Sequence, residues 1–135
     1  MREREIEKYL VQRAKQLGGE VRKVMYIGHR GAPDRLLMLP ERKRTAWSVS
    51  SALLGAEGII QETLPAATIW VEMKAPGKKP EPHQIREHVR MRRMGQRVVV
   101  IDSLEGVDNL MKELDWQSSP RMPGGVKGAP RGEGK

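Results

Sequence analysis

The chain has 135 residues, carries 25 Lys and Arg against 17 Asp and Glu, and contains no Cys. This length suits a single domain that buries its own core. The absence of Cys excludes disulfides, thiolate zinc sites and a cysteine nucleophile, and it fits a reducing compartment. No apolar run is long enough to cross a membrane, and the charged start Met-Arg-Glu-Arg-Glu is unlike a secretory signal. We therefore expect a cytoplasmic protein that makes no membrane contact.

The net charge of +8 and the pI near 10.1 favour a polyanionic partner, most often nucleic acid. A solvated basic surface would give the same composition. Aromatic residues are scarce, with three Trp, two Tyr and no Phe, so stacking platforms for single-stranded bases are not evident. Contacts to the backbone of duplex or branched nucleic acid fit this composition better.

Residues 3–17 predict an amphipathic helix that ends at Gly18-Gly19. Glu3 projects close to the middle of its apolar stripe, and Glu7 lies about 40° away at 100° per residue. A carboxylate aimed at the core is unusual unless it is paired or binds a metal. Acidic residues are also favoured in the first turn of any helix by the helix dipole. The pattern alone leaves both interpretations open.

Two strands are predicted next, over residues 20–27 and 36–39. The turn Gly31-Ala32-Pro33 separates them, and Asp34 opens the second strand. An Asp after Pro is normally a turn or capping residue, so Asp34 taken alone favours a structural role.

Segment 40–67 has no clean hydrophobic period. It starts with a charge cluster over residues 41–44, and a short helix is predicted over roughly residues 48–54. A connection this long inside a compact domain is either functional, such as a lid or a dimer arm, or contains further structure.

The stretch 69–77, Ile-Trp-Val-Glu-Met-Lys-Ala-Pro-Gly, alternates like a strand that stops at a Pro-Gly turn. The alternation places Glu72 and Lys74 side by side on one face. With Asp34 they make two strand-borne carboxylates and a lysine, which suit a hard divalent cation and an anionic substrate. The three His have no paired ligand spacing such as HExxH, so a zinc site is not expected.

A basic loop and a helix over residues 82–94 follow. On this helix Ile85 and Val89 share an apolar stripe, and Gln84 and His88 form the adjacent stripe. The basic residues of the loop and of the far side of the helix are the predicted phosphate contacts, although such runs are more often solvated faces. They are Lys78, Lys79, Arg86, Arg90 and Arg93.

Residues 97–101 predict a buried strand that is apolar on both faces. Asp102-Ser103 then caps a last helix that runs through Leu114. Residues 117–135 are rich in Ser, Pro, Gly and basic residues, which predicts a disordered basic tail. The resulting order, helix, three strands, helix, strand, helix, describes an α/β fold with a small mixed sheet flanked by helices.

Three stretches taken in order resemble the VRR-NUC nuclease domain, a branch of the PD-(D/E)xK superfamily. They are Gly31-Ala32-Pro33-Asp34-Arg35-Leu36, Val71-Glu72-Met73-Lys74-Ala75-Pro76-Gly77, and Gln84. A Pro-Asp or a Glu-x-Lys alone is a weak signal, so the resemblance rests on the ordered set and covers about residues 3–114. It implies a restriction-endonuclease-like core of order αβββαβα within residues 1–116, in which segment 40–67 is longer than the usual hairpin.

The resemblance also assigns roles to individual residues. It implies that Asp34 and Glu72 are metal ligands together with the main-chain carbonyl of Met73, and that Lys74 is the catalytic lysine. Gln84 matches the glutamine that supports the active site from the following helix. The family has a further glutamate on the first helix; both Glu3 and Glu7 fit it by register, and Glu3 is slightly preferred.

The activity implied is that of a Mg²⁺- or Mn²⁺-dependent DNA endonuclease. The resemblance further suggests branched substrates such as flaps or Holliday junctions, a role in DNA repair, and a bacterial or phage-infected host cell. Two symmetric cuts in a junction would require a homodimer, for which segment 40–67 is the candidate arm. The alternatives are a non-catalytic nucleic-acid-binding module on the same fold and an enzyme acting on a small molecule.

Overall fold

A computed structural model describes residues 1–28, 30–55 and 57–117, with side chains through Leu114. The described chain divides into two compact units, one made of Met1–Pro40 and Ala66–Asn109, the other of Glu41–Pro65 and the chain from Leu110. None of its helices is long and apolar enough to span a membrane. The elements follow in the order α1 (Glu3–Gln16), β1 (Glu20–Lys23), β2 (Arg35–Leu39), β3 (Arg42–Trp47), α2 (Val49–Leu53), β4 (Ile59–Leu64), β5 (Ala67–Met73), α3 (Pro82–Arg93), β6 (Val98–Ile101) and α4 (Leu104–Gln117).

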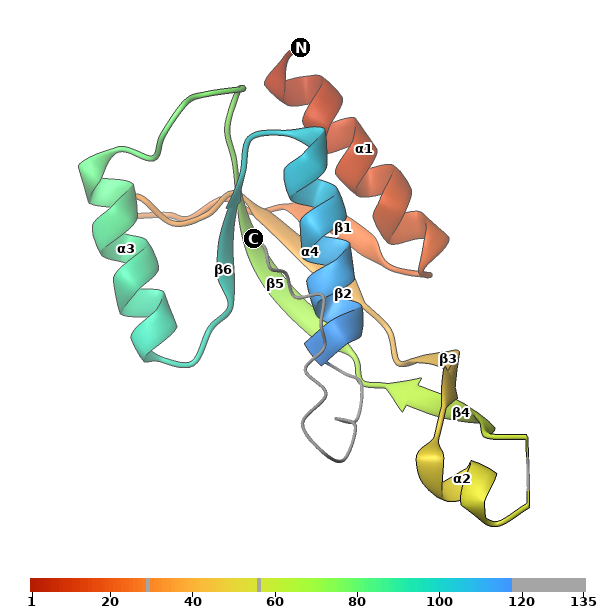
Figure 1. The fold of residues 1–135 in the computed structure, drawn as a ribbon. Coiled ribbons are helices and arrows are strands. Elements are labelled where there is room, and N and C mark those ends of the chain that lie inside the picture. Colours follow the sequence, from red (N-terminus) through yellow and green to blue (C-terminus); the bar gives the residue numbers. More distant parts are fainter. Residues whose placement is uncertain (29, 56, 118–135) are drawn as a thin grey trace. The chain divides into compact units, whose positions relative to one another are not determined.

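The first unit is built on a four-stranded mixed sheet with the strand order β1-β2-β5-β6 (Figure 1). The pairs β1/β2 and β2/β5 are antiparallel, and β5/β6 is parallel. Leaving out the β3-α2-β4 segment, the element order is the predicted αβββαβα. The predicted α/β fold with a small mixed sheet flanked by helices is therefore confirmed.

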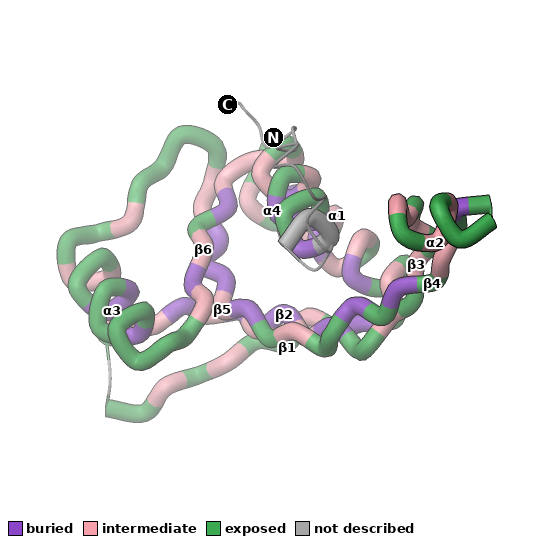
Figure 2. The backbone as a smooth tube through the Cα atoms, turned by 60° about the horizontal axis from the view of Figure 1, so that its bottom comes forward, coloured by how far each residue is buried: buried purple, intermediate pink, exposed green. Residues whose placement is uncertain are grey.

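One face of the sheet forms the core of this unit. Leu37 pairs with Ile69 across β2 and β5, and both are fully buried together with Val71. Helix α1 contacts β1, β2 and β5 and buries its own apolar stripe, Ile6, Leu10 and Ala14. Helices α1 and α3 lie on different sides of β5 (Figure 2). Side chains alternate along β5, so Trp70 and Glu72 point to the face opposite Ile69 and Val71, and Glu72 there contacts Gln84 of α3.

The edge strand β6 departs from the prediction of a fully buried strand. Val98 and Ile101 are buried, but Val100 is 38% exposed. Strand β6 pairs only with β5 in this sheet, so one of its sides has no neighbouring strand to cover it. The apolar run Val-Val-Val-Ile therefore reflects β propensity as well as burial.

Helix α4 begins as predicted, because Ser103 Oγ accepts a hydrogen bond of 2.9 Å from the Gly106 main-chain N–H. Its first turns are tied to α1: the Tyr9 hydroxyl donates to Asp108 Oδ1 at 2.6 Å, and the Arg13 guanidinium donates to the same oxygen. The helix continues to Gln117, three residues beyond its predicted end. The rest of the predicted disordered tail, residues 118–135, lies outside the described residues.

The second unit contains a hairpin, Glu41–Pro65, which we call the hairpin arm. It covers most of segment 40–67, for which the sequence shows no regular hydrophobic period. Strands β3 and β4 pair in antiparallel register from Arg42–Leu64 to Trp47–Ile59. The short helix α2 lies at the turn of this hairpin, within the predicted range, and Ser48 Oγ caps it by accepting from the Ser51 N–H at 3.3 Å. Four large apolar side chains of the hairpin arm are exposed: Trp47, Leu53, Leu54 and Ile59.

Candidate active site

The two predicted carboxylates lie on neighbouring strands at one end of the sheet. Asp34 directly precedes β2, and Glu72 is the last but one residue of β5. Because Arg35 pairs with Val71 in the antiparallel ladder, the next position of the register brings Asp34 opposite Glu72. The negative charge of Asp34 is close enough to raise the pKa of Glu72. The strand register therefore brings the two carboxylates together.

Gln84, in the first turn of α3, joins the Glu72-x-Lys74 pair to the helix. Its Nε2 donates to Glu72 Oε2 at 3.1 Å, and its Oε1 accepts from Lys74 Nζ at 2.9 Å. The same Oε1 accepts from the Glu81 main-chain N–H at 2.7 Å, which fixes the side chain as part of the helix cap. The nitrogen of the Gln84 amide thus faces the Glu72 carboxylate, and its oxygen faces the two N–H donors. This orientation holds Lys74 and Glu72 in place.

Glu72 carries the strongest electrostatic perturbation of the site. It is only 4% exposed, and burial, followed by the negative charge of Asp34, raises its pKa to about 7. Lys74, whose Nζ lies 3.7 Å from Glu72 Oε2, opposes this rise, and the charge of Glu3 adds to it. A bound cation would favour the ionised form of Glu72, because it offsets both the burial and the like charge.

The oxygens that a cation would need are available in this site. Among the described residues, Asp34 Oδ1 and Glu72 Oε1 are buried and have no hydrogen-bond partner, while Asp34 Oδ2 is paired with Arg35 Nη1 at 2.9 Å. Carboxylate oxygens are the ligands that Mg²⁺ and Mn²⁺ prefer, so the donor set fits such an ion. No three His, Asp or Glu side chains in the described chain lie close enough to hold a metal alone. Main-chain oxygens and water would have to complete the shell. Met73 could contribute only through its carbonyl, because its side chain is buried in the core.

The structure separates the two glutamates of α1. Glu7 makes a two-pronged ion pair with Arg35, with 2.6 Å from Nε to Oε2 and 2.9 Å from Nη2 to Oε1. This hydrogen bonding lowers the pKa of Glu7. Glu3 lies one turn earlier, half-buried, and its charge acts on both Glu72 and Arg35. Glu7 therefore anchors α1 to β2 through Arg35, and Glu3 is the glutamate whose charge is directed at the site.

Two residues that the sequence analysis did not assign to the site lie beside it. His88 is 2% exposed, and its Nε2, which has no hydrogen-bond partner among the described residues, lies 3.6 Å from Glu72 Oε1. Burial, followed by the positive charge of Arg92, lowers the pKa of His88, which favours the neutral imidazole. The spacing of Gln84 and His88, four residues apart on one helix stripe, is the signal that could have found it.

Tyr26 is the second such residue. Its hydroxyl is buried without a partner in the described chain, and its ring lies 6.0 Å from that of Trp70. Burial and the charges of Glu87 and Asp34 raise the pKa of Tyr26. Tyr26 comes after the end of β1, which is shorter than the strand predicted over residues 20–27. Its position in a predicted strand gave no sign that it lies near the site.

Helix α3 buries two polar side chains and leaves two apolar ones exposed to solvent. Ile85 and Val89 are 50% and 39% exposed, whereas Glu87 and His88 are buried. The predicted apolar stripe is thus on the outer side of the helix. The reason is that the inner side is occupied by the groups that hold or neighbour Glu72, beginning with Gln84.

Of the five predicted phosphate contacts, four have exposed side chains: Lys78, Lys79, Arg86 and Arg93. Arg90 is also half-exposed, but it is tied to the buried Glu87 by hydrogen bonds of 2.6 and 3.1 Å. These residues lie in the loop after β5 and on α3, directly after Glu72 and Lys74 along the chain. They could contact a backbone without disturbing the core.

Gly31 allows the loop before Asp34 to lie against the start of α3. Its φ is +86°, and a Cβ at this position would come within 2.7 Å of the His83 carbonyl oxygen. Only glycine fits such a close approach of two backbones. The Gly-x-Pro-Asp sequence therefore has a physical reason: it brings Asp34 to the helix that holds Gln84.

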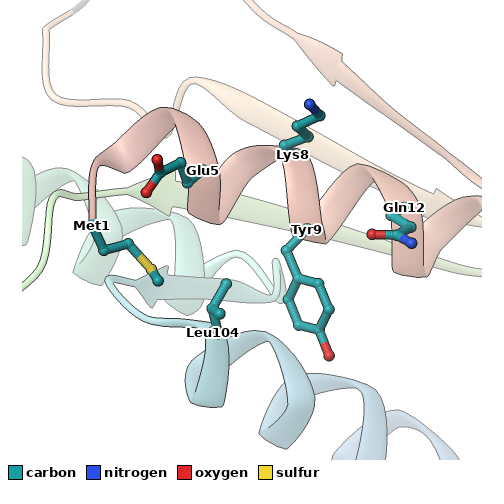
Figure 3. A pocket seen from close by; sticks show the side chains of 6 residues that line it. All are labelled: Met1, Glu5, Lys8, Tyr9, Gln12 and Leu104. Atoms are coloured by element: carbon teal, nitrogen blue, oxygen red, sulfur yellow. The ribbon is translucent and has the colours of Figure 1, made fainter.

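A surface depression between α1 and the start of α4 is separate from this site. Met1, Glu5, Lys8, Tyr9, Gln12 and Leu104 line it (Figure 3). None of the candidate active-site residues is among them. This depression is thus a separate feature of the surface, and the candidate site is the arrangement of side chains at the end of the sheet.

A mixed sheet with an Asp before one strand and Glu-x-Lys on the next, supported by Gln from the following helix, defines the restriction-endonuclease-like class of α/β folds. No model of a known protein family matches the chain. The chain is 39% identical over 103 residues to "Putative nuclease p44" of Acyrthosiphon pisum secondary endosymbiont phage 1, covering 76% of this chain and 85% of that protein. It also resembles a solved structure described as "VRR_NUC domain", with 36% identity, a TM-score of 0.58, and coverage of 82% of this chain and 94% of that chain. The chain belongs to the VRR-NUC domain family.

Exchanging each glutamate of α1 for Gln should separate their roles. Glu7→Gln leaves the buried Arg35 with a weaker partner, so we expect a loss of about 2–4 kcal/mol in the free energy of unfolding. Glu3→Gln, which breaks no such pair, should change it by less than about 0.5 kcal/mol. Urea denaturation followed by circular dichroism measures both. Equal losses would contradict the assignment of Glu7 as the anchor.

Replacing Glu72 by Gln should change how stability depends on pH in the absence of metal. The pKa of Glu72 is raised from 4.5 to about 7 on folding, so the folded chain holds this proton more tightly than the unfolded chain. The resulting stability is fully present below pH 4.5 and is lost as the pH rises through about 7. The stability of the parent relative to Glu72→Gln should therefore fall across this window, by up to about 3 kcal/mol. Urea denaturation in EDTA tests this, and a difference that is constant with pH would refute it.

Proposed function

We propose that the protein is a divalent-metal-dependent DNA endonuclease that hydrolyses phosphodiester bonds. The observation that carries this proposal is a pair of buried carboxylate oxygens, Asp34 Oδ1 and Glu72 Oε1, that have no hydrogen-bond partner in the part of the chain that the structure describes. Glu72 also lies next to the ammonium group of Lys74. The name of the phage relative, a nuclease, points the same way. Buried carboxylates that face DNA would repel its phosphates, so they would weaken binding in a module that only binds DNA.

The chain's own residues provide what a metal-assisted hydrolysis needs. Asp34 and Glu72, with the carbonyl of Met73, would hold Mg²⁺ or Mn²⁺, which when bound neutralises charge at the scissile phosphate and acidifies a water molecule. Lys74 is 17% exposed at its side chain and is held by Gln84. We infer that its ammonium group orients the attacking water and stabilises the negative charge that develops on the phosphate. Glu3 adds negative charge that attracts the cation.

The substrate we infer is DNA, contacted through its backbone. Lys78, Lys79, Arg86 and Arg93 are exposed and follow the Glu72-x-Lys74 motif along the chain, and the net charge is +8. Backbone contacts of this kind do not depend on sequence and weaken with salt. Together with the family resemblance, this supports a structure-selective enzyme for flaps or Holliday junctions. We place it in DNA repair or processing in the cytoplasm of a bacterium or a phage-infected host.

We further infer that the enzyme acts as a homodimer, because two symmetric cuts in a junction need two active sites. The hairpin arm supports this inference. Trp47, Leu53, Leu54 and Ile59 expose large apolar side chains on one short segment, and such clusters often mark protein interfaces.

Cleavage of a panel of labelled DNAs tests the proposed activity. Duplex, flap, splayed-arm and four-way-junction DNAs are incubated with Mg²⁺, Mn²⁺ or EDTA and either the parent, Glu72→Ala, or Glu105→Ala, an exposed carboxylate outside the candidate site, as the matched control. The parent and the control should cut in a metal-dependent manner and prefer branched DNA, whereas Glu72→Ala should lose at least 100-fold, as is usual for removing a metal ligand (about 3 kcal/mol or more of barrier).

The same panel distinguishes the rival functions. Salt-sensitive binding to DNA with no cleavage in any metal would replace the proposal by a non-catalytic binding module. Metal binding with no affinity for any DNA would favour an enzyme that acts on a small molecule.

Sedimentation velocity with and without a four-way junction tests the homodimer. We expect the parent to sediment as a dimer, and Leu53→Glu/Leu54→Glu to shift it to a monomer because charge is placed in an apolar contact. Ile85→Glu, an exposed apolar residue outside the hairpin arm, is the matched control and should remain dimeric. A parent that is monomeric under both conditions would remove this part of the proposal.

A further inference from the structure

Three buried polar atoms without hydrogen-bond partners in the described chain belong to the surroundings of Glu72. They are Asp34 Oδ1, Glu72 Oε1 and His88 Nε2. A buried polar atom without a partner is energetically unfavourable, so a cluster of them needs an explanation. A cation accounts for the two carboxylate oxygens, but it does not by itself explain the nitrogen of His88.

The position of His88 relative to Glu72 is specific. His88 lies one turn after Gln84 on the same side of α3, and the two residues face different oxygens of the same carboxylate. Gln84 Nε2 donates to Oε2 at 3.1 Å, and His88 Nε2 lies 3.6 Å from Oε1. His88 is 2% exposed, so water cannot readily take the place of Glu72 as its partner.

A carboxylate held at one oxygen can still turn about its last torsion angle, because that torsion has broad, weakly separated minima. A second donor at the other oxygen removes this freedom and fixes the plane of the group. Partners of this kind orient metal-binding carboxylates, and their loss typically weakens metal affinity 10–100-fold. A neutral imidazole can serve as this donor without adding a positive charge that competes with the cation.

We propose that His88 is a positioning residue for Glu72: its Nε2–H closes onto Oε1 while Gln84 holds Oε2, so the carboxylate presents its remaining lone pairs to the cation in one fixed orientation. The present 3.6 Å separation is longer than a formed hydrogen bond, so the proposal requires a small movement of the two side chains toward each other. This inference rests on the proposed metal-dependent function. It differs from direct ligation, in which the His88 nitrogen itself would bind the metal.

Mn²⁺ affinity, measured by electron paramagnetic resonance without DNA, tests this role independently of cleavage. The variants are His88→Leu, which removes the donor at similar volume, and His88→Gln, which keeps an N–H near the position of Nε2. Met91→Leu, in the buried part of the same helix, is the matched control. We expect His88→Leu to weaken Mn²⁺ binding about 10-fold or more, His88→Gln to restore most of the affinity, and Met91→Leu to bind like the parent.

Each other outcome overturns the inference in a distinguishable way. Equal affinity of the parent and His88→Leu means that His88 does not position Glu72. A His88→Gln variant as weak as His88→Leu means that only ring shape matters, and a ¹⁴N coupling from an imidazole bound directly to Mn²⁺ makes His88 a ligand instead. A parent that binds no Mn²⁺ overturns the proposed function as well. If His88→Leu is unfolded by circular dichroism, His88→Asn, whose shorter amide cannot reach Oε1, takes its place with the same expectation.

Discussion

Burial of the Glu72 carboxylate at the end of the central strand is the constraint on which the rest of the site depends. A buried carboxylate is unfavourable unless its oxygens are hydrogen-bonded or bind a cation. Gln84 satisfies one oxygen and at the same time holds Lys74, and the other oxygen is left toward Asp34 and His88. The pKa of Glu72 is raised because the carboxylate is buried and lies near the negative charge of Asp34. Residues with strongly perturbed pKa values are concentrated at functional sites.

The same constraint explains features of the fold that packing alone does not. Helix α3 turns polar side chains toward the sheet and leaves Ile85 and Val89 exposed. On the opposite face of the sheet, Arg35 is held between Glu7 and Asp34, so the helix α1 and the strand β2 are joined by charge at the place where Asp34 enters the site. Both arrangements bury fewer apolar side chains near the site and hold its polar side chains in fixed positions. Functional sites often lose stability in this way.

Much of the sheet and the helix order could be predicted from the sequence, because alternation and helical periodicity are local signals. The strand around Ile69 and Glu72 and the helix that starts at Pro82 follow from them, and so does the juxtaposition of Glu72 with Lys74. The outward position of Ile85 could not be predicted, because helical periodicity identifies an apolar stripe but not the chemistry of the surface against which the helix packs. The pairing within the hairpin arm could not be predicted from the sequence either. Apolar and polar residues alternate little along Arg42–Trp47 and Ile59–Leu64, and each strand is stabilised by pairing with the other.

The choice between Glu3 and Glu7 shows the same limit. Helix geometry places both near the core side, but only the three-dimensional position of Arg35, 28 residues later than Glu7 in the chain, shows that Glu7 is already paired. The position of His88 next to Glu72 could not be predicted either, because the spacing from Gln84 is the signal that the sequence offers for it. Long-range partners decide which polar residue on a helix is structural and which faces the site.

The most direct test of the central claim is a crystal structure of the parent grown with Mn²⁺, with an anomalous difference map at the manganese edge. We predict one strong peak within bonding distance of Asp34 Oδ1 and Glu72 Oε1. We also expect the main-chain oxygen of Met73 in the same coordination shell. A well-ordered site with no peak at millimolar Mn²⁺, or a peak bound to neither carboxylate, would show that these residues do not form a metal site.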